Sequence, residues 1–448
     1  VTGRRRSISV YNATIQIINC IGSIWQKGTG KVMSNKGMII KECTRLNAAR
    51  RVLEGHIDCA SFFRRIQGDL LITGGEAGNQ IMVFDLFRSA LERNDMPTIL
   101  LTSHLDLMKD IQRKRDMHEI SCVITSCPSD KNYHPFYGMS AQQILRFISM
   151  TAEEMGYGIL TDQVMIYTAA ILNVVAAKYP VSLPAIMNLL NEDDDFISEF
   201  ALRSGLSNVI ADNIRANHEA GIVLRRLFEN LEEVFRDIYI PGSDTKYNFQ
   251  SGAKDNVSGM AMYACSANQF IFNSYLKEEI YYTLKHVPKI RVIVDEIDFV
   301  NEKDELLKFL MQSKRQGKVE LVMVSRNIKD ALHGNIELDF QNVVMFLHGT
   351  SAATDDLSTD LFGSYKYYFP VPVAGNTPHV FFSIERTVNW QIQSEERPRV
   401  RSQDLYAKLS FWGRSSTYLA VKTTANANIY LIPITDFLPA VTGVPVIV

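Results

Sequence analysis

The chain has 448 residues, a length that predicts two or three domains rather than one compact core. Its hydrophobic content of 46%, charged content of 21% and mean hydropathy of -0.04 are typical of an ordinary globular protein. The net charge of -2 argues against a strongly basic nucleic-acid-binding protein. Six scattered cysteines argue against a disulfide framework and favour a reducing, cytoplasmic setting.

No uninterrupted apolar run reaches the length that a membrane-spanning helix needs. The longest candidate, at 164–177, contains Tyr167, Thr168 and Asn173, so we expect a buried helix there. The chain begins at Val1 rather than at a methionine, which leaves room for an upstream segment that carries a membrane anchor.

The first 139 residues change from a basic segment to an alternation of strand and helix patterns. Basic residues are dense among residues 1–65, and residues 37–40 form a short β-type run. The alternation that follows favours a βαβ unit with a parallel sheet. In chain order we expect a strand at 66–73, a glycine-rich loop at 74–80, a helix at 81–91, and strands at 97–102 and 121–125.

The middle of the chain, at 140–244, has helical spacing and almost no strand pattern, so we expect an all-α insertion there. The flanking segments 1–139 and 245–448 would then form one discontinuous α/β domain. In its second part we expect helices at 269–285 and 304–313, and strands at 291–294, 320–324, 342–347 and 430–434.

Two adjacent acids, Asp295 and Glu296, directly follow a short run that suits a buried parallel strand. Ligands of open α/β sheets bind at the carboxyl ends of such strands. Asp295 is therefore placed to hold a Mg²⁺ ion that carries nucleotide phosphates, and Glu296 to polarise an attacking water. A solvated acidic turn after a strand explains the same pattern equally well.

The glycine-rich loop lies where a phosphate-binding loop would be, after a strand and before a helix. Such a loop wraps phosphates with backbone N–H groups and adds a lysine and a Ser/Thr hydroxyl. Asn79 and Gln80 stand at the lysine and hydroxyl positions here, so efficient ATP hydrolysis is not expected. The candidate phosphate contacts are Gly74, Gly75, Gly78, Asn79 and Gln80.

A second glycine run, at 28–31, lacks the leading glycine and the following hydroxyl, and it predicts a hairpin turn. Two arginines are candidate catalytic cations. Arg315 ends the helix after the acids, where a ring ATPase can place an arginine that reaches a neighbouring subunit's nucleotide. Stabilisation of a helix C-terminus is the alternative. Arg326 ends the next strand as a sensor of the terminal phosphate, or as a surface arginine.

This order of motifs resembles the type IV secretion coupling proteins, the TraG/TraD-type branch of the FtsK/HerA ring ATPases, over about residues 66–368. The chain departs from the family pattern at Asn79 and Gln80, at Thr102 in place of an acid, and at Arg326 in place of a glutamine. The resemblance implies a RecA-like P-loop sheet with helices on both faces, interrupted by the all-α inserted domain, and with a degenerate phosphate loop.

The resemblance also implies a coupling-protein-like component of a type IV secretion or conjugation machine, on the cytoplasmic side of the bacterial inner membrane. Its partners would be other subunits of that machine and a protein or nucleoprotein substrate, with DNA as a further candidate, in a homo- or hetero-oligomer. ATP and Mg²⁺ are the implied cofactors, with weak or lost hydrolysis. An active ATP-driven DNA-translocating motor and a non-enzymatic scaffold subunit stay open as alternatives.

Overall fold

The structure is a computed structural model and divides into two compact units, Leu53–Leu357 with Ser402–Val448, and Val1–Val52 with Ser358–Arg401. The glycine run at 28–31 and the loop residues Gly78 and Asn79 lie outside the described residues. The structure describes residues 35–437 except for 49–51, 58, 76–79, 121–122, 153–154, 157–161, 241–246, 298–304, 327, 329–338, 379–383, 407, 410–414 and 424–425.

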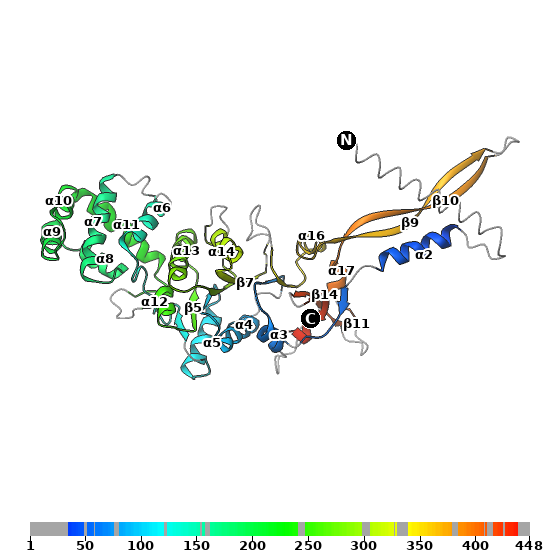
Figure 1. Cartoon of the computed structure of the whole chain (residues 1–448), viewed down its shortest axis with the longest axis horizontal. Coiled ribbons are helices and arrows are strands. Elements are labelled where there is room, and N and C mark those ends of the chain that lie inside the picture. Colours follow the sequence, from blue (N-terminus) through cyan, green and yellow to red (C-terminus); the bar gives the residue numbers. More distant parts are fainter. Residues whose placement is uncertain are drawn as a thin grey trace. The chain divides into compact units, whose positions relative to one another are not determined.

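A ten-stranded sheet forms the centre of the larger unit, in the order β1-β14-β13-β8-β2-β7-β6-β3-β5-β4 (Figure 1). The pairs from β8 to β4 are parallel, whereas β13 joins β8 and β14 in antiparallel pairs. The predicted α/β fold with a mostly parallel sheet is thus confirmed. Its strands are β1 (Val52–Glu54), β2 (Leu70–Thr73), β3 (Thr98–Thr102), β4 (Val123–Ser126), β5 (Gly259–Tyr263), β6 (Ile290–Asp295), β7 (Val319–Ser325), β8 (Asn342–Met345), β13 (Tyr418–Thr423) and β14 (Asn426–Pro433).

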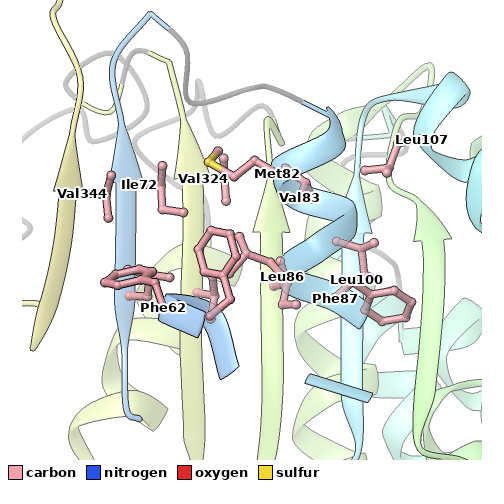
Figure 2. Close-up of a cluster of buried hydrophobic side chains, with 14 of the residues drawn as sticks. Phe62, Ile72, Met82, Val83, Leu86, Phe87, Leu100, Leu107, Val324 and Val344 are labelled. Atoms are coloured by element: carbon pink, nitrogen blue, oxygen red, sulfur yellow. The ribbon is translucent and has the colours of Figure 1, made fainter. Parts of the chain in front are cut away.

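Helices cover both faces of the parallel part of the sheet. On one face, Met82, Val83 and Leu86 of α4 are buried against strand side chains that include Ile72 and Val324 (Figure 2). On the other face, α14 packs against β7 and α13. Burial from both sides explains why these strands are continuous apolar runs. The covering helices are α3 (Cys59–Arg65), α4 (Gln80–Arg93), α5 (Leu105–Asp116), α13 (Gln269–His286) and α14 (Glu305–Arg315).

One charged residue, Arg291, lies within the buried strand β6 and is only 1% exposed. Its Nε donates to Glu320 Oε1 at 2.5 Å, and its two Nη atoms donate to the carboxylate of Asp95 at 3.0 and 3.1 Å. This two-pronged geometry satisfies the guanidinium inside the protein, where an unpaired charge would be strongly destabilising.

Six helices follow one another from residue 141 to residue 234, and no strand interrupts them among the described residues of that span. Asp193 caps one of them by accepting the N–H of Phe196 at 2.7 Å, which explains the acidic run there. The boundaries at 140 and 244 stay predictions. The helices are α6 (Ala141–Thr151), α7 (Asp162–Lys178), α8 (Leu183–Leu190), α9 (Asp194–Arg203), α10 (Asn208–Ala216) and α11 (His218–Val234).

In the described parts of the chain, no single helix has the length and apolarity of a membrane span. The two helices α7 and α8 reach both only when they are taken together, and they are bent by 115° with respect to each other.

The smaller unit contains a long antiparallel ribbon, β9 (Ser364–Pro378) with β10 (Ile384–Pro398), and helix α2 (Asn35–Asn47). The side chain of Asn47 exchanges two hydrogen bonds of 2.8 Å with the backbone of Tyr368. The β-type run predicted at 37–40 was wrong, because these residues belong to α2. Contacts with the ribbon decide the structure there, whereas the local sequence pattern alone does not.

The remaining elements include a small antiparallel pair, β11 (Lys408–Leu409) with β12 (Ser415–Ser416). The other helices are α12 (Phe249–Lys254), α16 (Ser351–Phe362), α17 (Ser402–Leu405) and α18 (Ile434–Phe437).

Candidate functional site

The glycine turn and the paired acids lie at the same edge of one sheet. Gly74 follows β2 and Asp295 ends β6, with only β7 between these two strands. All three strands are parallel, so their carboxyl ends share an edge, and two strand spacings separate the segments by about 10 Å. A phosphate loop and a cation-binding carboxylate need this arrangement, although about 220 residues separate them in the sequence.

The turn after β2 requires glycine at position 74. Gly74 has a φ of +114°, and a Cβ built there would lie 2.6 Å from the carbonyl oxygen of Phe346. No other residue type fits that position without a shift of the neighbouring strand end. Gly75 is less constrained, because a Cβ there would meet only the oxygen of Leu347, at 3.4 Å.

The amides of both glycines are used within the fold. The N–H of Gly74 donates to the oxygen of Ser325 at 3.3 Å, and that of Gly75 donates to the oxygen of Leu347 at 2.9 Å. In this arrangement neither amide is available to a phosphate. Gln80, the last residue of the predicted loop, begins α4 and is half-buried.

Asp295 is fully buried at the end of β6. Thr102, at the end of the neighbouring strand β3, donates its hydroxyl to Asp295 Oδ2 at 2.6 Å. The other oxygen, Oδ1, is buried and has no hydrogen-bond partner among the described residues. Burial raises the pKa of Asp295 to about 7; the Thr102 hydroxyl opposes this rise, and the charge of Glu296 adds to it.

Glu296 has an unusual backbone conformation, with a φ of +51°. Its Oε1 accepts the backbone N–H of Arg326 at 2.7 Å, and the Nε of the same arginine lies 4.0 Å from it. The carboxylate is therefore held by the end of the neighbouring strand. A general base needs a free oxygen within reach of its water, and this contact occupies one of the two oxygens of Glu296.

His104 also belongs to this site, although no sequence motif marks it. Its Nε2 is buried without a hydrogen-bond partner and lies 4.0 Å from Asp295 Oδ2. Its backbone N–H donates to the Thr102 hydroxyl at 3.0 Å, which fixes the turn after β3. Burial lowers the pKa of His104. The available signal was its position two residues beyond the end of a buried strand.

The two candidate arginines lie in different places. Arg326 is exposed at the carboxyl end of β7, beside Glu296. Arg315 is exposed at the end of α14, before β7 begins, so it lies toward the opposite edge of the sheet. Its neighbour Lys314 pairs at 3.3 Å with Asp69, which precedes β2. Arg315 therefore does not serve the site of its own chain, and its action on a neighbouring subunit stays a prediction.

The side chains at this edge fit a hard divalent cation that keeps most of its water. A buried carboxylate with one unpartnered oxygen, next to a hydroxyl, supplies one or two oxygen ligands, and Mg²⁺ often takes only that many from a protein. A complete metal-ligand cluster of three or more acidic, histidine or cysteine side chains is absent from the described residues. Asp295 and Thr102 would hold such an ion, which when bound would neutralise phosphate charge.

Comparisons with known proteins give matches by structure only. No protein-family model matches the chain, and no curated protein matches it. Among solved structures, the bacterial conjugative coupling protein TrwBdeltaN70 in its unbound monoclinic form is 14% identical over 87% of this chain and 90% of that one, with a TM-score of 0.44. TrwB in complex with ADP and Mg²⁺ is 14% identical over 87% and 91%, with a TM-score of 0.42.

A third solved structure, VirB4 of Thermoanaerobacter pseudethanolicus, is 12% identical over 69% of this chain and 88% of that one, with a TM-score of 0.40. At such identities and TM-scores, the similarity assigns neither a family nor an activity to this chain. The first two matches are coupling proteins, the class of protein that the order of sequence motifs resembles.

Proposed function

We propose that this chain is a coupling-protein-like component of a type IV secretion or conjugation machine, with weak or lost ATP hydrolysis. It would act in an oligomer with other subunits of that machine, on the cytoplasmic side of the bacterial inner membrane, and recruit a protein or nucleoprotein substrate through its helical segment. One observation carries the proposal. A fully buried carboxylate with an unpartnered oxygen, Asp295, shares a sheet edge with a glycine turn whose loop lacks both the lysine and the hydroxyl.

Two further features support the loss of hydrolysis. Asn79 cannot replace a positive charge against a triphosphate, and Glu296 is held by the backbone of Arg326. Weak nucleotide binding through Asp295 remains compatible with both features, since a cation can hold phosphates without a lysine.

The test is a thermal-unfolding titration of the purified protein with ATP and Mg²⁺, next to the double variant N79K/Q80T. A ligand at a hundred times its Kd stabilises a fold by about 2.7 kcal/mol. The quantity compared is the stabilisation that disappears with EDTA. We expect it to be small in the natural protein and clear in the double variant. The lysine and the threonine restore groups that a phosphate loop uses. If neither protein is stabilised, that result contradicts a nucleotide site here.

The alternatives make different predictions. For an active DNA-translocating motor, the natural protein would hydrolyse ATP, DNA would stimulate it, and Glu296→Gln would abolish the activity. For a non-enzymatic scaffold, the double variant would not gain nucleotide binding, and Asp295→Ala would leave partner binding unchanged.

A further inference from the structure

A second cleft lies on the larger unit, among helices α6, α13 and α14, and it is not assigned to any function above. Its volume is about 560 Å³, within the range of about 300–1,000 Å³ that small-molecule sites occupy. The two long helices pack together (Figure 1) and contribute most of the lining, and α6 adds one side chain. The cleft is formed by helices that cover a face of the sheet, whereas the Asp295 site lies at the sheet edge.

The lining of this cleft is strongly basic. Five cationic side chains line it against two acidic ones, although the whole chain carries a net charge of -2. Such a local excess of positive charge attracts anions. The cationic residues are Arg146, Lys277, Lys285, Lys308 and Lys318.

A single lysine, Lys277, forms ion pairs with both acidic residues. Lys277 Nζ lies 3.6 Å from Glu278 Oε1 and 3.5 Å from Glu305 Oε2. Within the part of the chain that the structure describes, the other four cations form no ion pair. Among the described residues these four positive charges have no ion-pair partner, so an anion in the cleft would be attracted to them.

The floor of the cleft offers two further kinds of contact. Tyr281 is 38% exposed. Its ring contacts the ring of Phe309 edge to face, with 6.2 Å between the centroids, and Lys285 Nζ lies 4.7 Å from the centroid of the Tyr281 ring. Glu278 is 4% exposed, and its Oε2 is buried with no hydrogen-bond partner in the described part of the chain. An aromatic platform suits a flat ring, and an unpartnered carboxylate oxygen suits a hydroxyl donor.

We propose that this cleft binds a nucleotide unit, either as a free nucleotide or as one unit of a single strand. The phosphate lies against Lys308 and Lys318, and the base lies on Tyr281. A ribose hydroxyl donates to Glu278. The inference does not depend on the site at Asp295.

The test is fluorescence titration of the full chain with etheno-ADP, whose label is on the base and leaves both ribose hydroxyls free, in the presence of EDTA, which removes the cation that the Asp295 site needs. A labelled oligouridylate provides the second arm. We expect saturable binding that weakens with salt, and a Kd about tenfold higher in K308E/K318E, because each reversal replaces an attraction by a repulsion. Tyr281→Leu raises the Kd about fivefold or more through lost stacking.

Lys178→Glu is the matched control, since it reverses an exposed lysine in the last turn of α7, outside the cleft. We expect its Kd to equal that of the natural protein. Tighter binding of the oligouridylate identifies a strand as the source, and tighter binding of the nucleotide identifies a free ligand. Absence of binding with both probes overturns the proposal, as does an equal effect of K308E/K318E and Lys178→Glu. If K308E/K318E unfolds, K308Q/K318Q replaces it, with the same expectation at about threefold.

Discussion

Replacement of Asp295 by asparagine tests how the buried carboxylate affects the folded protein. Its pKa of about 7, against an ordinary value of 3.8, means that the folded state disfavours the charged form. One pKa unit corresponds to about 1.4 kcal/mol, so the charged carboxylate destabilises the fold by about 4 kcal/mol at alkaline pH. An asparagine keeps the oxygen that accepts from Thr102, but its N–H₂ group takes the place of the unpartnered Oδ1, at a cost of about 1–3 kcal/mol.

The net expectation is that Asp295→Asn raises the free energy of unfolding by about 1–3 kcal/mol at about pH 8. Between about pH 4 and pH 7 the folded protein retains a proton that the unfolded chain has lost, so the stability of the natural protein falls as the pH rises. The benefit of the substitution therefore grows by about 2–3 kcal/mol from about pH 5 to about pH 8.

Urea unfolding of both proteins across this pH range measures the difference. Asp212→Asn is the matched control, because Asp212 is exposed and its substitution should show no such pH dependence. A benefit of Asp295→Asn that is the same at all pH values, or a loss of stability at alkaline pH, would refute the reasoning. An added prediction follows for Mg²⁺: any stabilisation by the ion should disappear in Asp295→Asn.

Three further predictions concern stability, and each is measured by urea unfolding. Gly74→Ala should lower the free energy of unfolding by about 3 kcal/mol or more, because its Cβ would lie 2.6 Å from Phe346 O at a φ of +114°. Gly75→Ala is the control and should be nearly neutral, so equal effects of the two substitutions would contradict this reasoning. Arg291→Met should lower the free energy of unfolding by about 3 kcal/mol, since Glu320 loses its main partner but keeps Lys289 at 3.7 Å. An unchanged free energy of unfolding would show that the buried ion pairs of Arg291 add nothing to stability. Glu279→Gln should raise stability at about pH 8 and not at about pH 5, because burial raises the pKa of Glu279 to about 7; a gain independent of pH would exclude this cause.

The sequence predicted the strands that are buried on both faces, because such strands are short, continuous apolar runs whatever their partners. β2 and β3 fall within predicted runs, and β6 and β7 match predicted runs but are one residue longer at each end. Asp295 is the last residue of β6, and Glu296 follows it. β5 was missed, because Gly259 to Tyr263 combine glycine, alanine and methionine, which have little strand preference. Packing against α4 places this strand: a Cβ at Gly259 would lie 2.3 Å from Leu91 Cδ2, so a larger residue there would displace the Leu91 side chain.

The contacts within the candidate site could not be predicted, because they join residues far apart in the chain. Thr102 and Asp295 are 193 residues apart, and only the pairing of β3 with β6 brings the hydroxyl to the carboxylate. The hydrogen bond from the Arg326 N–H to Glu296 forms in the same way, because β7 lies next to β6 and ends beside Glu296. A sequence motif therefore identifies which residue types are present, whereas the sheet order decides which oxygens remain available.

The oxygens that remain available separate a degenerate site from a bare scaffold. A subunit that only assembles does not need a carboxylate at position 295. An asparagine would accept the same hydrogen bond from Thr102 without the destabilising effect of a buried charge. Asp295 thus destabilises the fold by an amount that a bound cation would offset. The loop, by contrast, lacks the lysine and the hydroxyl that would hold a triphosphate tightly. A buried carboxylate beside an incomplete phosphate loop is thus the combination on which the proposal of weak, cation-dependent nucleotide binding rests.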